Sequence, residues 1–117
     1  MMKDICLNGK LLCRAEVVKG LNSYIGLMFR RKLPEGEGLI LKCPKGGCSI
    51  HTWFMRFAID VFFLDENFRV LDKTSMRPWN VYRPKGKASF VLETNAGEIE
   101  PEIGDGIEIN QNPSNVS

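Results

Sequence analysis

The chain has 117 residues, of which 44% are hydrophobic and 26% charged, and its formal net charge is +2. This composition is that of an ordinary globular protein, and a charge of +2 is too small to imply a polyanionic partner by itself. The charge is unevenly distributed, because residues 69–87 sum to +5 and residues 88–108 to −6. Neighbouring surfaces of opposite sign usually attract each other, which is the simplest interpretation of this pattern.

The N-terminus lacks the apolar stretch of a signal peptide, and no apolar run approaches the roughly 20 residues needed to span a bilayer. We therefore expect a cytoplasmic protein without membrane association. Residues 1–110 are expected to form one globular domain and residues 111–117 a flexible C-terminal tail. In the cytoplasm we expect all four cysteines to be reduced: Cys6, Cys13, Cys43 and Cys48.

The first part of the chain predicts two strands, one helix and a third strand. Residues 3–7 and 10–18 alternate loosely around Asn8-Gly9, which is a strong hairpin signal. The next apolar residues recur at the i, i+3, i+4, i+7 and i+8 spacing of a helix: Leu21, Tyr24, Ile25, Met28 and Phe29. This short helix should end before Pro34 and pack on the sheet. Residues 39–43 predict a short, largely buried strand.

The longest apolar run, residues 53–71, is expected to organise the fold. One of its faces at period two is wholly apolar, whereas Arg56 and Asp60 lie on the other. Aromatic and β-branched residues favour a strand, in which these charges would lie roughly 13 Å apart at about 3.3 Å per residue. Each would then need its own partner. We expect Glu93 for Arg56, and backbone or side-chain donors for Asp60, with Arg30 among the candidates. In a helix the two charges would be i and i+4 neighbours and could pair directly.

A hairpin is predicted after this run, because the polar turn 65–68 separates two apolar stretches. Asn67 is the turn residue expected to adopt left-handed backbone angles. Residues 76–87 are expected to be irregular, and residues 89–94 and 106–110 to be strands. The predicted fold class is mostly β (α+β), a small partly closed barrel or two packed sheets with one short helix.

Six short segments, in this order and spacing, resemble domain-of-unknown-function family 192 (DUF192): Gly26–Arg30, Gly36–Gly38, Met55–Asp65, Val91–Glu93, Ala96-Gly97 and Gly104-Asp105. The resemblance covers roughly residues 10–110. It implies a compact, mostly β domain found in bacteria and archaea, some of whose members carry a signal peptide. It implies no reaction and no catalytic residue. Ala58 stands where family members often have proline, and Phe68 where the turn often has glycine.

Cys43, Cys48 and His51 are the strongest metal-ligand candidates, because thiolates and imidazole are zinc ligands. Their spacing is not the usual Cys-x2-Cys, so two small thiols beside a glycine loop are the preferred interpretation. A Cys43–Cys48 disulfide and a zinc site are the alternatives. We expect no metal and no cofactor.

Three functions stay open. The preferred one is a non-enzymatic small-ligand- or partner-binding domain, with its site drawn from these candidates: Arg30, His51, Arg56, Asp60 and Glu93. The second is a small hydrolase in which Asp60 works with His51, although no nucleophile motif accompanies them. The third is a weak nucleic-acid binder through residues 77–87, where basic and aromatic residues alternate. A charged loop over the acidic segment explains the same residues, so nucleic acid is the least expected partner.

Overall fold

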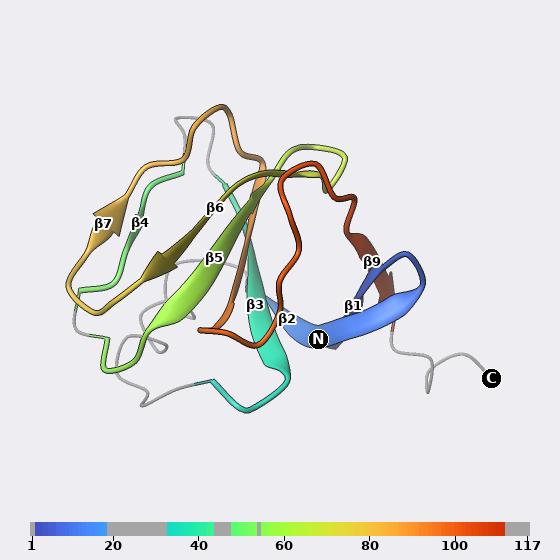
Figure 1. Ribbon diagram of the computed structural model, residues 1–117, viewed down its shortest axis with the longest axis horizontal. Helices are drawn as coiled ribbons and strands as arrows, with labels where there is room; N and C mark the ends of the chain where they lie inside the picture. The colour runs from blue at the N-terminus through green and yellow to red at the C-terminus, as the bar shows by residue number, and fades with distance from the viewer. Residues whose placement is uncertain (1, 19–32, 44–47, 54, 112–117) are drawn as a thin grey trace.

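The computed structural model describes residues 2–18, 33–43, 48–53 and 55–111, and these form nine strands in two sheets (Figure 1). The prediction of a mostly β fold is therefore confirmed. The predicted helix lies outside the described residues, as does Arg30. Within the described part, no helix is long and apolar enough to cross a membrane.

The nine strands are β1 (Met2–Leu7), β2 (Lys10–Val18), β3 (Glu37–Lys42), β4 (Ile50–His51), β5 (Ile59–Leu64), β6 (Val70–Met76), β7 (Val81–Tyr82), β8 (Phe90–Asn95) and β9 (Glu108–Gln111). Seven form one sheet in the order β6-β5-β8-β3-β2-β1-β9, and β4 pairs with β7 in a second sheet. This two-stranded sheet lies at one end of the long axis, and β1 and β9 lie toward the other (Figure 1). Among the described residues the larger sheet does not close into a barrel.

The first hairpin forms where the sequence predicts it. Asn8 and Gly9 both have positive φ, 52° and 80°, as the two central residues of a tight hairpin turn require. Asn tolerates this region and Gly favours it, so the turn carries little strain. The pairing of β1 with β2 and the boundaries of both strands confirm the prediction.

The central strand is shorter than the apolar run predicts. It begins at Ile59, because the chain turns earlier, where the Met55 amide donates to the Thr52 carbonyl (3.2 Å). Arg56 therefore precedes the strand and is exposed, so its placement with Asp60 on one strand is wrong.

Both faces of β5 are buried. Its residues alternate between two apolar clusters, with Ile59, Val61 and Phe63 in one and Phe62 and Leu64 in the other. Such burial on both faces suits a central strand, and β5 lies between β6 and β8. The cluster that holds Phe63 also includes Ile50 and Met55, which come from the segment around β4.

The hairpin between β5 and β6 confirms the prediction, but its left-handed residue is Phe68 (φ 62°), not Asn67. One carboxylate oxygen of Asp65 accepts from the amides of Asn67 (2.8 Å) and Arg69 (2.9 Å), so the turn is held by its first residue. Phe68 tolerates the conformation because its ring packs on Phe90, with centroids 4.7 Å apart. Glycine, frequent here in the family the sequence resembles, would fit the same backbone.

The last strands lie close to their predicted positions. β8 lies between β5 and β3, near the middle of the larger sheet, and β9 pairs with β1. At Gly38 an ideal Cβ atom would approach the Glu93 carbonyl oxygen to 2.6 Å, so only glycine lets β3 and β8 come this close. β9 ends at Gln111, and the rest of the predicted tail lies outside the described residues.

Candidate functional site

Thr52 is the centre of a hydrogen-bond network that joins the segment after β4 to the segment before β7. Its side chain is fully buried; the hydroxyl donates to the Arg77 carbonyl (2.6 Å) and accepts from the Asn80 amide (2.9 Å). Its amide donates to the Asn80 carbonyl and its carbonyl accepts from the Trp79 amide, both at 2.8 Å. Four hydrogen bonds from one residue thus fix residues 77–80 against β4.

This network holds Trp79 in an unfavourable backbone conformation, with φ at 67°. A bulky residue rarely adopts a left-handed conformation, and such outliers gather at functional sites. The Trp79 residue is 60% exposed, so core packing does not explain its position. The strained backbone conformation therefore occurs at a tryptophan that is largely exposed to solvent.

Trp79 belongs to an apolar surface on the two-stranded sheet. Trp53 is 46% exposed and Val81 59%, and the ring of His51 lies 4.8 Å from that of Trp53. His51 is also paired with Val81 across the sheet. We call His51, Trp53, Trp79 and Val81 the aromatic surface. It contains three of the five exposed large hydrophobic residues in the described part of the chain.

The aromatic surface belongs to a strongly basic part of the molecule. Residues 48–58 and 77–87, which we call the basic lobe, hold five Lys and Arg residues and no Asp or Glu. With the total at +2, the rest of the chain carries −3. All five residues are exposed, and none forms an ion pair within the described residues: Arg56, Arg77, Arg83, Lys85 and Lys87. The expected attraction between residues 69–87 and 88–108 is seen instead at Lys73, whose ammonium group pairs with the Glu102 carboxylate (3.0 Å).

The buried carboxylate of Asp72 connects the basic lobe to the larger sheet through hydrogen bonds. Asp72 on β6 accepts hydrogen bonds from the Tyr82 hydroxyl (2.8 Å) and the Lys85 amide (2.9 Å). Burial opposes ionisation, but the hydrogen bonds from Lys85, Tyr82 and Lys73 outweigh it and lower the pKa of Asp72. The Tyr82 ring also stacks on Phe63, with centroids 5.7 Å apart. The lobe is therefore held in a fixed orientation.

Asp60, the predicted acid/base candidate, lies in a groove of about 650 Å³ on the larger sheet. One carboxylate oxygen accepts from the Ser75 hydroxyl (2.5 Å) and the other from the Gly97 amide (2.8 Å). Asp60 thus ties β5 to β6 and to the turn after β8, and both of its oxygens already have partners. His51 is not among the residues that line the groove, so the geometry does not bring the proposed hydrolase pair together.

Replacing Asp60 with alanine is expected to lower the free energy of unfolding by about 1–2 kcal/mol, because two hydrogen-bond donors lose their acceptor. Urea denaturation measures this loss. The Ser75→Ala variant and the double variant complete a mutant cycle, in which the two losses should not add. Full additivity would mean that the Ser75–Asp60 hydrogen bond contributes nothing.

Glu93 lies in the middle of the larger sheet and is completely buried. Its neighbours on the adjacent strands are Val61 and Leu39, so the same face of the sheet offers it apolar side chains. Neither carboxylate oxygen has a hydrogen-bond partner among the described residues. Burial raises the pKa of Glu93 to about 8. The expected Arg56–Glu93 pair is not observed, because Arg56 is exposed on the basic lobe.

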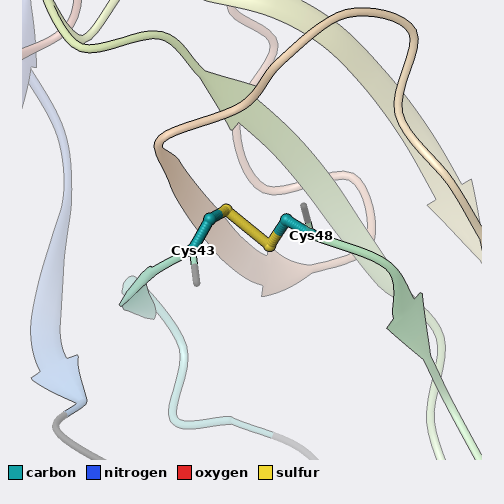
Figure 2. Close-up of a disulfide and its surroundings, with 2 residues drawn as sticks. All are labelled: Cys43 and Cys48. Carbon is teal, nitrogen blue, oxygen red and sulfur yellow. A yellow bond between two sulfur atoms is a disulfide. The ribbon is translucent and has the colours of Figure 1, made fainter. Parts of the chain in front are cut away.

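Cys43 and Cys48 form a disulfide, so the preferred expectation of two free thiols is wrong (Figure 2). The error came from the expected reducing compartment, whereas the five-residue separation already allowed the bond.

Cys6 and Cys13 are free, and burial raises the pKa of the Cys13 thiol to about 12. Within the described residues, no group of three metal-binding side chains comes together.

A family model described as DUF192, "Uncharacterized ACR", matches residues 8–110. The chain belongs to the DUF192 family. The UPF0127 protein of Pyrococcus horikoshii is 41% identical over 86 residues, which are 71% of this chain and 75% of that protein. The UPF0127 protein of Pyrococcus furiosus is 39% identical over 97 residues, 78% of this chain and 81% of its own. The family that the sequence motifs indicated is confirmed.

Two solved structures share the fold of this DUF192 domain. A protein of Sinorhizobium meliloti 1021, described as a candidate transcription regulator, has a TM-score of 0.79 at 17% identity, over 93% of this chain and 94% of its own. A protein of unknown function from Novosphingobium aromaticivorans has a TM-score of 0.73 at 22% identity, over 92% and 83%. At these identities the likeness concerns the fold alone.

The sequence predictions missed most of what builds the aromatic surface of this DUF192 domain. Trp53 begins the apolar run 53–71 and by period two belongs to its wholly apolar face, and no sequence pattern indicates the roles of Thr52 and Asp72. One signal was available, because residues 48–58 and 77–87 share a complete lack of acidic residues. The pairing of β4 with β7, which joins these segments, could not be predicted from strands of two residues each.

Proposed function

We propose that this DUF192 domain is a non-enzymatic binding domain whose partner is single-stranded nucleic acid, held by the basic lobe. The observation that carries the proposal is the presence of two exposed tryptophans, Trp53 and Trp79, in two segments that pair through β4 and β7 and hold five exposed cations and no acidic residue. Base stacking on indole rings and attraction of phosphates are the two interactions that sequence-tolerant single-strand binders combine.

The geometry favours nucleic acid over the two other functions. Both oxygens of Asp60 accept hydrogen bonds inside the fold, and His51 does not line its groove, which weakens the hydrolase alternative. A purely hydrophobic protein partner would gain little from the exposed cations. The Sinorhizobium protein of the same fold, described as a candidate transcription regulator, is consistent with a nucleic-acid partner.

The first test measures fluorescence anisotropy of a labelled oligothymidylate. Replacing Trp79 with alanine is expected to weaken binding about 5- to 150-fold, because the loss of one stacked base costs about 1–3 kcal/mol. The control is Leu11→Ala, since Leu11 is 52% exposed on β2, outside the basic lobe. An unchanged affinity for Trp79→Ala would contradict the stacking role.

The salt dependence of the same binding tests the phosphate contacts. Replacing both Arg77 and Arg83 with glutamine should make the slope of log K against log salt shallower by about 1.4, or about 0.7 for each lost contact. Lys10→Gln, in β2, is the control and should leave the slope unchanged. A domain that binds an acidic peptide but no oligonucleotide would instead make its partner a protein.

A further inference from the structure

The disulfide joins the larger sheet to the basic lobe. Cys43 directly follows β3, where its amide donates to the Ser89 carbonyl (2.9 Å), and Cys48 lies just before β4. Figure 2 shows the two side chains meeting from these two parts of the fold. The bond is therefore a covalent connection between the two sheets.

A pocket of about 330 Å³ opens beside one of the two cysteines. Seven of the described residues line it: Cys48, Ser49, Arg83, Pro84, Gly86, Lys87 and Ala88. Cys43 is not among them. The pocket thus borders Cys48, and its two charged residues among those described, Arg83 and Lys87, are both cations. A small molecule that enters it meets Cys48 in a positively charged environment.

We propose that this pocket is a thiol–disulfide exchange site for an anionic low-molecular-weight thiol of the glutathione type. The carboxylates of such a thiol are attracted by Arg83 and Lys87, and its thiolate attacks the sulfur of Cys48. A bond forms between the two sulfurs as the Cys43–Cys48 bond breaks, and Cys43 leaves as a thiolate that takes a proton from water. A second thiol then attacks the mixed disulfide, which yields two protein thiols and one oxidised thiol dimer.

The exchange chemistry does not depend on the proposed nucleic-acid function, so it can be tested alone. Protein is mixed with reduced glutathione, quenched with acid and alkylating reagent, and followed by intact mass spectrometry. The double variant Arg83→Gln/Lys87→Gln is expected to be reduced about three- to tenfold more slowly than wild type. With 2-mercaptoethanol, whose only charge is that of the attacking thiolate, the double variant should be slowed less than with glutathione. The control is Lys3→Gln/Lys10→Gln, on β1 and β2 outside the basic lobe, and should match wild type with both thiols.

A second measurement tests which sulfur is attacked. In a Cys6→Ser background, Cys43→Ser should accumulate a glutathionyl adduct on Cys48 faster than Cys48→Ser accumulates one on Cys43, when both are treated with oxidised glutathione. Equal rates at the two cysteines would overturn the assignment of Cys48. A double charge variant that slows both thiols equally, or neither, would overturn the role of the pocket.

Discussion

Replacing Phe63 with alanine is expected to lower the free energy of unfolding by about 3–5 kcal/mol. Phe63 is completely buried on β5 and belongs to the cluster that lies between the larger sheet and the basic lobe. Its ring also stacks on Tyr82, which Asp72 holds in place. The substitution therefore opens a cavity at the point where the two sheets meet. Urea denaturation followed by far-ultraviolet circular dichroism measures the loss.

Phe57 is the matched control for this prediction. The period-two pattern assigns it to the same apolar face as Phe63, but it precedes β5 and is only half-buried. Since less of its surface leaves water on folding, Phe57→Ala should cost about 1–2 kcal/mol. A larger loss for Phe57 than for Phe63 would mean that the apolar core is centred on the segment before β5 and not on the strand.

Short sequence patterns predicted the parts of the fold whose interactions join residues close together along the chain. The Asn8-Gly9 turn fixed the first hairpin, because two consecutive residues that accept positive φ leave few other geometries. The short apolar stretch that predicts β8 and the polar turn after β5 were equally informative. In each case the decisive interactions lie within a few residues along the chain.

The candidate site depends on contacts between distant segments, and these could not be predicted. Trp53 extends an apolar run and so resembles a core residue, until the turn at Thr52 directs it to the surface. The network that fixes Trp79 reaches from Thr52 to Asn80, a separation of 28 residues. The Cys43–Cys48 disulfide is predicted from the sequence only as an alternative, because the expected reducing compartment carries more weight there than the short cysteine spacing.

The sequence predicts that Glu93 is charged and pairs with a cation. In the structure its carboxyl group has no hydrogen-bond partner among the described residues. Its carboxyl group is completely buried, and the residues beside it on the sheet are Val61 and Leu39. Removal from water favours the neutral acid, which is why its pKa rises from 4.5 to about 8. We therefore expect Glu93 to bind a proton at neutral pH in the folded protein but not in the unfolded chain.

This difference makes stability depend on pH in a definite direction. Between about pH 4.5 and 8 the folded protein binds one more proton at Glu93 than the unfolded chain, so the free energy of unfolding should fall as pH rises. The full loss is about 5 kcal/mol, from about 1.4 kcal/mol for each pH unit. Glu93→Gln cannot ionise, so it should match wild type near pH 4 and be more stable by several kcal/mol at pH 8.

Urea denaturation of both proteins at unit intervals from pH 4 to pH 9 measures this difference directly. Glu100→Gln is the control, because Glu100 is exposed and its removal should leave the pH dependence of wild type intact. If Glu93→Gln instead destabilises the protein by a similar amount at every pH, then Glu93 is ionised in the folded state and paired with a cation. The sign of the Glu93→Gln effect at pH 8 therefore distinguishes a buried neutral acid from a buried ion pair.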